Sequence, residues 1–446
     1  MYKKHLILTL LFVSQFAMAQ NHSGDILSMK DRAATINRLL EDKIQNYLPD
    51  LMRKEGIDMW VVVSREYNED PIIKTLLPAE WLAARRRTIL VFYDGGEGTG
   101  IETLAVARYN VGSSFKSAWD KEKQPNQWAR LTEIIKERNP KKIGINKSEY
   151  FGLADGIVAT DYEEFLNAMG KNLSDRVVSA EKLGIAWLET RTKAEMAVYP
   201  HVIKIGHNII AEAFSDNVIT PGVTTTEDVV WWMREKIREL KLVAWFHPTV
   251  DVQRADPDND EGQRSFSMRP GVDVIMPGDL LHCDIGFTYL RLNTDQQQLA
   301  YVLKPGETEV PEYLQKALAV GNRLQDIFTD NFKEGRTGNE ILKLSREQAI
   351  AEGIRPSIYT HPIGYHGHGA GTTLGMWDSQ GGVPVKGDYP LRSNTSYSIE
   401  LNATVFLKEW NKDIRIMLEE EAHFDERGVW YMDGRMESIR VVNPKN

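Results

Sequence analysis

The feature that most constrains this chain is a pair of aspartates, Asp284 and Asp295, eleven residues apart. The first lies in the segment Gly278–Gly286 and the second ends the segment Leu292–Asp295, a pattern that predicts two short strands joined by a tight turn. Because side chains alternate along a strand, two positions on paired strands can face one pocket. Two carboxylates held together there repel each other, and proteins usually keep such a pair to bind a cation.

Further residues of metal-ligating types follow in the sequence. A histidine cluster runs from His361 to His368, Glu400 lies in the apolar stretch Ser398–Leu401, and Glu419 lies in a run of three glutamates. A lone charge on an apolar strand is costly unless it is paired or bound to a metal. Two aspartates, one histidine and two glutamates can coordinate two divalent metals, and an oxygen-rich set with one imidazole suits Mn, Zn, Co or Fe(II).

The order and local context of these residues resemble the pita-bread metallopeptidase superfamily, which includes aminopeptidase P, prolidase, methionine aminopeptidase and creatinase. Gly278–Gly286 is similar to the family's first aspartate strand, and Thr294-Asp295 to the context of the second aspartate. Tyr397–Glu400 is similar to the strand that ends at the first glutamate, and Arg415-Ile416 to the pair before the second. The resemblance implies four metal-ligating carboxylates, Asp284, Asp295, Glu400 and Glu419.

The last of these ligands has an alternative. The family places its second glutamate two residues after the arginine, whereas Glu419 lies four residues after Arg415. Side-chain alternation puts Arg415, Glu419 and Glu421 on one face of a strand. We expect Glu419 to be the ligand because the residues after it, through Gly428, are similar to the family's closing hairpin; Glu421 is the alternative.

The histidine cluster departs from the family pattern H-x-x-G-H, in which a further histidine follows seven residues on. His361-Pro-Ile-Gly364 fits the opening, but Tyr365 stands where the pattern has its next histidine. His366 or His368 must then take the ligand role across a small insertion. Gly367–Gly371 has the form G-H-G-x-G and needs the shorter insertion, so we expect His368 to be the metal ligand, with His366 as the alternative.

The resemblance also implies roles in catalysis. Glu400 accepts the proton of the water that attacks the carbonyl, and histidines stabilise the tetrahedral intermediate and donate to the leaving nitrogen. Two of the family's histidines are missing, since Ser265–Met268 and Trp377-Asp378 stand at their positions. We therefore expect His361 and His366 to take over these roles. His247 is either a structural turn residue or a replacement for the missing upstream histidine, which a different loop path would bring to the site.

The chain has 446 residues, enough for two domains. Hydrophobic periodicity predicts one helix over residues 28–52 and one long helix over 192–218, and Thr224–Asp228 predicts the cap of the next helix. Together with the resemblance, these patterns lead us to expect two domains. They are an α/β N-terminal creatinase-like domain over residues 27–184 and an α+β pita-bread catalytic domain over residues 190–446.

Residues 1–19 predict a secretory signal peptide. Two lysines precede the apolar stretch Leu6–Phe16, and Ala17-Met-Ala19 has the form of a cleavage site. The apolar run is too short to span a bilayer comfortably, and the single cysteine, Cys283, excludes an intramolecular disulfide. The net charge of −9 disfavours nucleic acid as a partner. We expect export across the inner membrane to a bacterial periplasm, with no membrane contact after cleavage.

Three functions are compatible with the sequence. The complete N-terminal domain favours relatives of aminopeptidase P or prolidase, so the leading hypothesis is a peptidase that cleaves short peptides with proline at the second position. It would use two divalent metal ions per chain, with Mn before Zn, Co or Fe. The same fold also supports non-peptide C–N hydrolysis and lyase chemistry, and a metal-binding homologue without catalysis is the third hypothesis. The resemblance further implies a homodimer in which the N-terminal domain shapes the neighbour's site.

Overall fold

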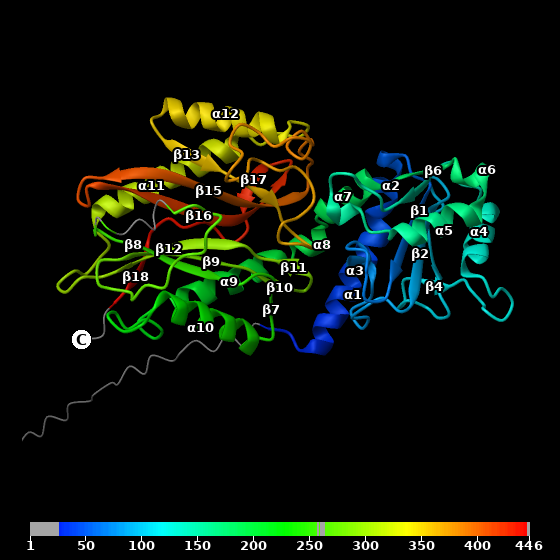
Figure 1. The fold of residues 1–446 in the computed structure, drawn as a ribbon, viewed down its shortest axis with the longest axis horizontal. Coiled ribbons are helices and arrows are strands. Elements are labelled where there is room, and N and C mark those ends of the chain that lie inside the picture. The colour runs from blue at the N-terminus through cyan, green and yellow to red at the C-terminus, as the bar shows by residue number, and fades with distance from the viewer. Residues whose placement is uncertain (1–25, 257, 259–263, 444–446) are drawn as a thin grey trace, which may run out of the picture.

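The structure is a computed structural model that describes residues 26–256, 258 and 264–443. The chain forms two parts that lie side by side and meet near residue 190 (Figure 1). The predicted signal peptide falls outside the described residues. Among the helices that are described, none has the length and apolar character that a membrane span requires.

The N-terminal part is a mixed six-stranded sheet between two layers of helices, with the strand order β4-β3-β2-β1-β5-β6. Side chains of the central strand alternate between the two layers: Trp60 and Val62 pack in one cluster with Ile44 of the first helix, and Val61 packs in another with Leu131. The elements in chain order are α1 (Met29–Asn46), α2 (Leu48–Glu55), β1 (Met59–Arg65), α3 (Ile73–Leu76), β2 (Arg87–Asp94), β3 (Ile101–Val106), β4 (Lys116–Ser117), α4 (Gln127–Arg138), β5 (Ile143–Ile145), the 3₁₀ helix η2 (Gly152–Ala154), α5 (Ala159–Met169), α6 (Lys171–Ser174), β6 (Val177–Ser179) and α7 (Glu181–Glu189).

The C-terminal part is built on a nine-stranded sheet in which β13, β15, β16, β12, β9 and β8 follow one another, while β14 pairs with β15, β17 with β16 and β18 with β12. A small separate sheet has the order β11-β10-β7. The elements in chain order are α8 (Lys193–Met196), α9 (Tyr199–Ala213), α10 (Thr226–Glu239), β7 (Val243–Ala244), β8 (Thr249–Gln253), β9 (Leu280–Ile285), β10 (Phe287–Tyr289), β11 (Leu292–Asn293), β12 (Gln296–Val302), α11 (Glu312–Asp330), α12 (Gly338–Ala351), β13 (Arg355–Ile358), β14 (His361–Pro362), β15 (Thr395–Leu407), β16 (Lys412–Asp425), β17 (Gly428–Tyr431) and β18 (Arg440–Val442).

Two helices that the sequence predicts as continuous are each divided, and both predictions are wrong at the same kind of residue. The segment 28–52 forms α1 and α2, with Pro49 in the first turn of α2, and the segment 192–218 forms α8 and α9, with Pro200 in the first turn of α9. Proline has no N–H to continue a helix and its ring clashes with the preceding turn, whereas the first turn tolerates it. The predicted cap is confirmed, because Thr225 and Asp228 form a capping box at the start of α10.

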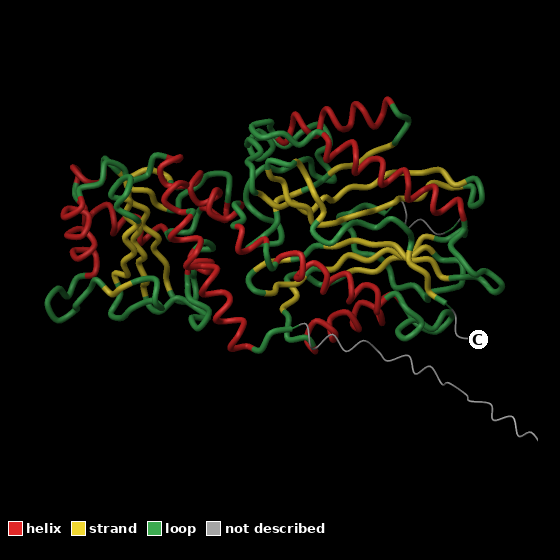
Figure 2. The backbone as a smooth tube through the Cα atoms, turned by 180° about the vertical axis from the view of Figure 1, so that it is seen from behind, coloured by secondary structure: helices red, strands yellow, loops and turns green. Residues whose placement is uncertain are grey.

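The helices of the C-terminal part lie on the outer sides of its sheet. Figure 2 shows the strands between the pair α9–α10 and the pair α11–α12. Cys283 of β9 packs in one hydrophobic cluster with residues of α9 and α10, and Leu418 of β16 packs in another with residues of α11. Alternation turns the neighbours of these residues, Asp284 and Glu419, to the opposite face. The inner face of the sheet therefore carries the acidic side chains.

Candidate metal centre

The two aspartates reach the inner face from neighbouring stretches of chain. Asp284 lies on β9, opposite Gln297 of β12, and Asp295 directly precedes β12. The predicted tight turn between them is present as the hairpin β10–β11, whose turn residues Leu290 and Arg291 have positive φ of 54° and 65°. Positive φ is uncommon for residues other than glycine, so the surrounding structure must enforce this turn.

The two glutamates come from the long hairpin β15–β16. Glu400 and Glu419 are register partners in this antiparallel pair, so their side chains emerge side by side on one face. Gln297 of β12 is in turn the register partner of Glu419, which sets the hairpin beside the aspartates. Glu421, the alternative ligand, lies beside Asp295: its Oε1 accepts a hydrogen bond of 2.5 Å from the backbone N–H of Asp295, and its Oε2 is buried without a partner among the described residues.

His361 lies in the middle of the carboxylates. Its short strand β14 pairs with β15 at Ser398, two residues before Glu400. The Nε2 atom of His361 is 3.5 Å from Oδ2 of Asp295, 3.6 Å from Oε1 of Glu419 and 4.0 Å from Oε2 of Glu400. From the sequence we expect His361 in a proton-transfer role, but its position is that of a residue surrounded by the predicted ligands.

Potential ligand atoms gather in three overlapping groups, each with its atoms within 4.8 Å of one another. One group joins His361, Glu400 and Glu419, and a second joins Asp284, Asp295 and Glu419. The third joins Asp295, His361 and His368. Glu419 is common to the first two, so this residue stands between two adjoining clusters of ligand atoms.

Burial and mutual repulsion make this cluster unfavourable as a set of free anions. Burial, and then the nearby Glu419 carboxylate, raise the pKa of Asp284 to about 8, and the same two causes raise the pKa of Asp295 and of Glu400. The Oδ1 atom of Asp284 and Nε2 of His361 are buried without a hydrogen-bond partner among the described residues. A divalent cation would neutralise the repulsion and satisfy these atoms, so the residues fit a metal site.

The sequence model of metallopeptidase family M24 matches residues 200–426, just over half of the chain and all of the residues that form this cluster. The chain belongs to metallopeptidase family M24. It is therefore a metal-dependent peptidase, as the resemblance implied.

Solved structures of M24-type peptidases share the fold over nearly the whole chain. An X-Pro aminopeptidase from Thermotoga maritima matches with a TM-score of 0.61 and 17% identity over 88% of this chain and 100% of its own. An Xaa-Pro dipeptidase from Bacillus anthracis matches with a TM-score of 0.56 and 14% identity over 93% and 100%. Prolidase from Pyrococcus furiosus matches with a TM-score of 0.52 and 14% identity over 87% and 99%. No curated protein matches in sequence. The predicted fold class, an α/β N-terminal domain followed by a pita-bread domain, is confirmed.

The other histidines of this M24 chain lie at different distances from the cluster. His368 is exposed, and its ring centroid is 4.7 Å from that of His361 and 5.2 Å from that of Trp245. His366 belongs to none of the ligand groups found among the described residues. Burial, and then the positive charges of Arg191 and Lys74, lower the pKa of His366 to about 4. His247 contacts Arg234 and the ring of Trp231 instead.

Tyr365, which replaces a family histidine, joins the two parts of the chain. Its hydroxyl donates to the buried carboxylate of Glu195, and its ring contacts both Lys43 of α1 and the Arg191 guanidinium, each 4.4 Å from the ring centroid. Lys43 and Arg191 also form ion pairs with Glu195, at 3.7 and 3.6 Å. The residue that breaks the histidine pattern therefore belongs to a buried network between the two parts, and a Cβ at its neighbour Gly364 would lie 2.9 Å from the Arg191 guanidinium and displace it.

A cavity of about 390 Å³ opens beside the cluster. His361, His368 and Glu400 line it from the C-terminal part, and Phe151 and Leu153 line it from the N-terminal part. Other lining residues include Met376 and Trp377, which give the cavity apolar walls. The carboxylate cluster therefore forms the polar end of a mostly apolar pocket that both parts of the chain build.

Proposed function

We propose that this M24 protein is an Xaa-Pro peptidase that holds two divalent metal ions. The observation that carries the proposal is the pair of overlapping ligand groups that share Glu419. The proposed ligands are Asp284, Asp295, His361, Glu400 and Glu419. Glu419, the residue common to these two groups, is proposed to serve both ions. This oxygen-rich set with one imidazole favours Mn, with Zn, Co or Fe as alternatives.

In this proposal His361 replaces His368 as the histidine ligand. Nε2 of His361 faces three carboxylates at 3.5 to 4.0 Å, whereas His368 shares a group only with Asp295 and His361 itself. His368 lines the cavity beside His361 and takes the proton-transfer role that the sequence analysis gave to His361 and His366. This proposal gives His366 no role at the centre, because it belongs to none of the ligand groups found among the described residues.

Bound metal ions would polarise the scissile carbonyl and make a water nucleophilic near neutral pH. The chain's own residues then handle the proton and the substrate. Glu400 lies at the junction of the ligand cluster and the cavity, where it can accept a proton from the attacking water. The exposed His368 can donate to the leaving nitrogen from the cavity side. The apolar walls suit a short peptide with a hydrophobic or proline side chain.

The preference for proline at the second position is supported by the substrates named for the similar structures, an X-Pro aminopeptidase and an Xaa-Pro dipeptidase. Export to a periplasm is supported by the signal-like residues 1–19. The homodimer is supported by the family resemblance.

The test combines metal content with peptide hydrolysis. Residues 20–446 are purified, their metal is measured by mass spectrometry, and Ala-Pro and Ala-Pro-Ala are offered with and without Mn(II). We expect about two metals per chain and Mn-dependent cleavage, which falls roughly 10²–10⁴-fold in Glu400→Gln. Glu420→Gln, altered on the opposite face of β16, should keep its metal. Bound metal without cleavage of any Xaa-Pro peptide would redirect the proposal to a non-peptide amide, and absence of metal would overturn it.

A further inference from the structure

Three consecutive glutamines, Gln296, Gln297 and Gln298, are buried on β12, each at most 3% exposed. Buried amides need hydrogen-bond partners, and each of the three finds a different one. Gln296 donates to the backbone of α9 at Ile203, and Gln298 donates to Glu420 on the outer face of β16. Gln297 points to the inner face, where the carboxylate cluster lies.

The carboxamide of Gln297 holds one oxygen of each proposed glutamate ligand. Its Nε2 is 2.5 Å from Oε1 of Glu400 and 2.7 Å from Oε2 of Glu419. The opposite oxygens, Oε2 of Glu400 and Oε1 of Glu419, are the ones that approach Nε2 of His361. Gln297 therefore fixes which oxygen of Glu400 is turned toward the space among the ligands, and it orients Glu419 together with Ser398, whose hydroxyl donates to Oε1 of Glu419 at 2.7 Å.

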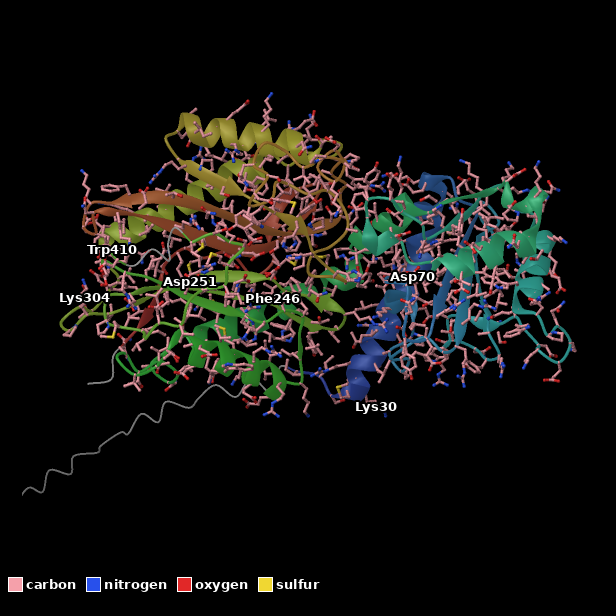
Figure 3. All side chains as sticks on the ribbon, viewed as in Figure 1. Lys30, Asp70, Phe246, Asp251, Lys304 and Trp410 are labelled. Carbon is pink, nitrogen blue, oxygen red and sulfur yellow. The ribbon has the colours of Figure 1, made fainter. Side chains whose placement is uncertain are left out.

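Two more buried residues fix the orientation of Gln297 itself. Nε2 of His282 lies 2.9 Å from the Oε1 atom of Gln297, and Nδ1 of His282 lies 3.1 Å from Oδ2 of Asp251. Both His282 and Asp251 are less than 5% exposed, and Figure 3 places Asp251 within the sheet region of the C-terminal part. With its oxygen on His282, the carboxamide has its N–H groups directed at the glutamates.

We propose that Gln297, held by His282 and Asp251, is a positioning residue of the metal centre. It presents one defined oxygen of Glu400 and of Glu419 to the metal ions, and so it sets the affinity for metal. This inference rests on the metal centre of the proposed function. Groups that orient metal ligands from behind typically change metal affinity by about 10- to 100-fold when they are removed.

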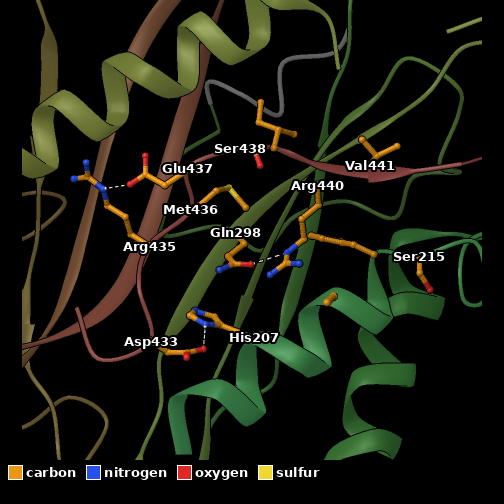
Figure 4. A pocket seen from close by; sticks show the side chains of 13 residues that line it. His207, Ser215, Gln298, Asp433, Arg435, Met436, Glu437, Ser438, Arg440 and Val441 are labelled. Atoms are coloured by element: carbon orange, nitrogen blue, oxygen red, sulfur yellow. Dashed lines mark hydrogen bonds and ion pairs between the residues drawn. The ribbon is translucent and has the colours of Figure 1, made fainter. Parts of the chain in front are cut away.

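The neighbouring Gln298 provides a matched control. It is equally buried and also donates to a glutamate of β16, Glu420, at 2.9 Å, but on the other face. Its own oxygen accepts from Arg440 at 2.8 Å. Gln298 and Arg440 line a separate cavity of about 580 Å³, which His207 and Asp433 also line (Figure 4). Loss of the Gln298 amide therefore tests for general damage to β12 without touching the metal face.

The experiment is a titration of the metal-free full-length mature chain with Mn(II) by calorimetry, on the wild type, Gln297→Met and Gln298→Met. Methionine keeps the length and volume of glutamine and removes its hydrogen bonds. We expect a Kd about 10- to 100-fold weaker in Gln297→Met and unchanged within about twofold in Gln298→Met. Circular dichroism of both metal-free variants shows whether they are folded. If Gln297→Met does not fold, Asp251→Asn takes its place and should weaken Mn(II) binding in the same direction.

The outcomes separate this inference from the proposed function. Wild-type protein that binds no Mn(II), nor Zn(II) or Co(II), overturns the proposed metal centre. If the wild type and Gln297→Met bind Mn(II) with the same Kd, only the proposed role of Gln297 is overturned. Equal losses in Gln297→Met and Gln298→Met also overturn it, because the effect would then come from β12 as a whole.

Discussion

At the scale of single residues, the run Glu419-Glu420-Glu421 shows how one strand gives neighbouring acids different tasks. Glu419 joins the ligand cluster, while Glu420 faces outward and meets His207 at 2.7 Å. Glu421 shares the inner face but accepts a hydrogen bond from the backbone N–H of Asp295. Alternation along the strand separates Glu420 from the other two. The choice between Glu419 and Glu421 depends on the register with Glu400, which the sequence does not encode locally.

The four carboxylates were expected from the family resemblance and their order in the chain, and strand pairing brings them together in the structure. The role of Gln297 was not predicted, although a signal was present: three glutamines in succession on an otherwise apolar strand require buried partners. The proposed histidine ligand differs from the expected one for a different reason. The sequence pattern is broken at Tyr365, whereas pairing of β14 with β15 carries His361 to the glutamates.

Tyr365 supports a prediction about stability. Tyr365→Phe keeps the ring that contacts Lys43 and Arg191 but removes the hydroxyl that donates to the buried Glu195 carboxylate. We expect a loss of about 1.5–3 kcal/mol, the range for hydrogen bonds to charged groups, seen as a lower thermal midpoint. The control is Tyr67→Phe, since Tyr67 is 88% exposed. Equal midpoints for Tyr365→Phe and the wild type would contradict a structural role for this hydroxyl.

At the scale of elements, a helix cap could be predicted from the local sequence, and the departures from the predicted helices have local causes. The capping box at Thr225 was visible in the sequence. The breaks before α2 and α9 follow from Pro49 and Pro200, which apolar periodicity alone passes over. The hairpin β10–β11 turns through Leu290 and Arg291, two residue types that do not predict a positive φ. Its formation depends on tertiary context more than on turn chemistry.

The contact between α9 and β16 supports a prediction about pH. His207 of α9 lies between Glu420, at 2.7 Å, and Asp433, at 2.8 Å. Burial lowers its pKa, but the two carboxylates outweigh burial and raise the pKa to about 10, from an ordinary value of 6.5. The folded state therefore holds this proton more tightly than the unfolded state. The resulting stability is complete below about pH 6.5, declines as pH rises and is lost above about pH 10.

This effect can be isolated with the variant His207→Gln, which keeps a hydrogen-bonding side chain without the charge. The difference in unfolding midpoint between the wild type and the variant should be largest near pH 6 and should shrink toward pH 10. Urea unfolding at several pH values measures it, and the subtraction cancels all groups that titrate in both proteins. A difference that stays constant across this range would show that the His207 charge does not stabilise the fold.

At the scale of the whole molecule, the cavity beside the carboxylate cluster depends on how the two parts meet. Phe151 and Leu153 belong to the loop and 3₁₀ helix before α5, yet they line the same cavity as His361 and Glu400. The buried network of Lys43, Glu195 and Tyr365 holds the two parts of the chain together. Nothing in the local pattern of the segment around residue 151 indicated a role at the site, because that role arises only from domain placement.

Leu153 provides a test of this arrangement that leaves the metal ligands untouched. It is partly exposed in the cavity wall, so Leu153→Ala should cost little stability while it removes apolar surface from the substrate's surroundings. A loss of roughly 1 kcal/mol of apolar contact corresponds to about a fivefold increase in KM for Ala-Pro-Ala, with kcat and metal content unchanged. Tyr150→Ala, in the same loop but outside the cavity lining, is the control and should leave KM unaltered. A fall in kcat at constant KM would place Leu153 in the support of the catalytic residues, and no change in either constant would mean that the N-terminal part does not contact the substrate.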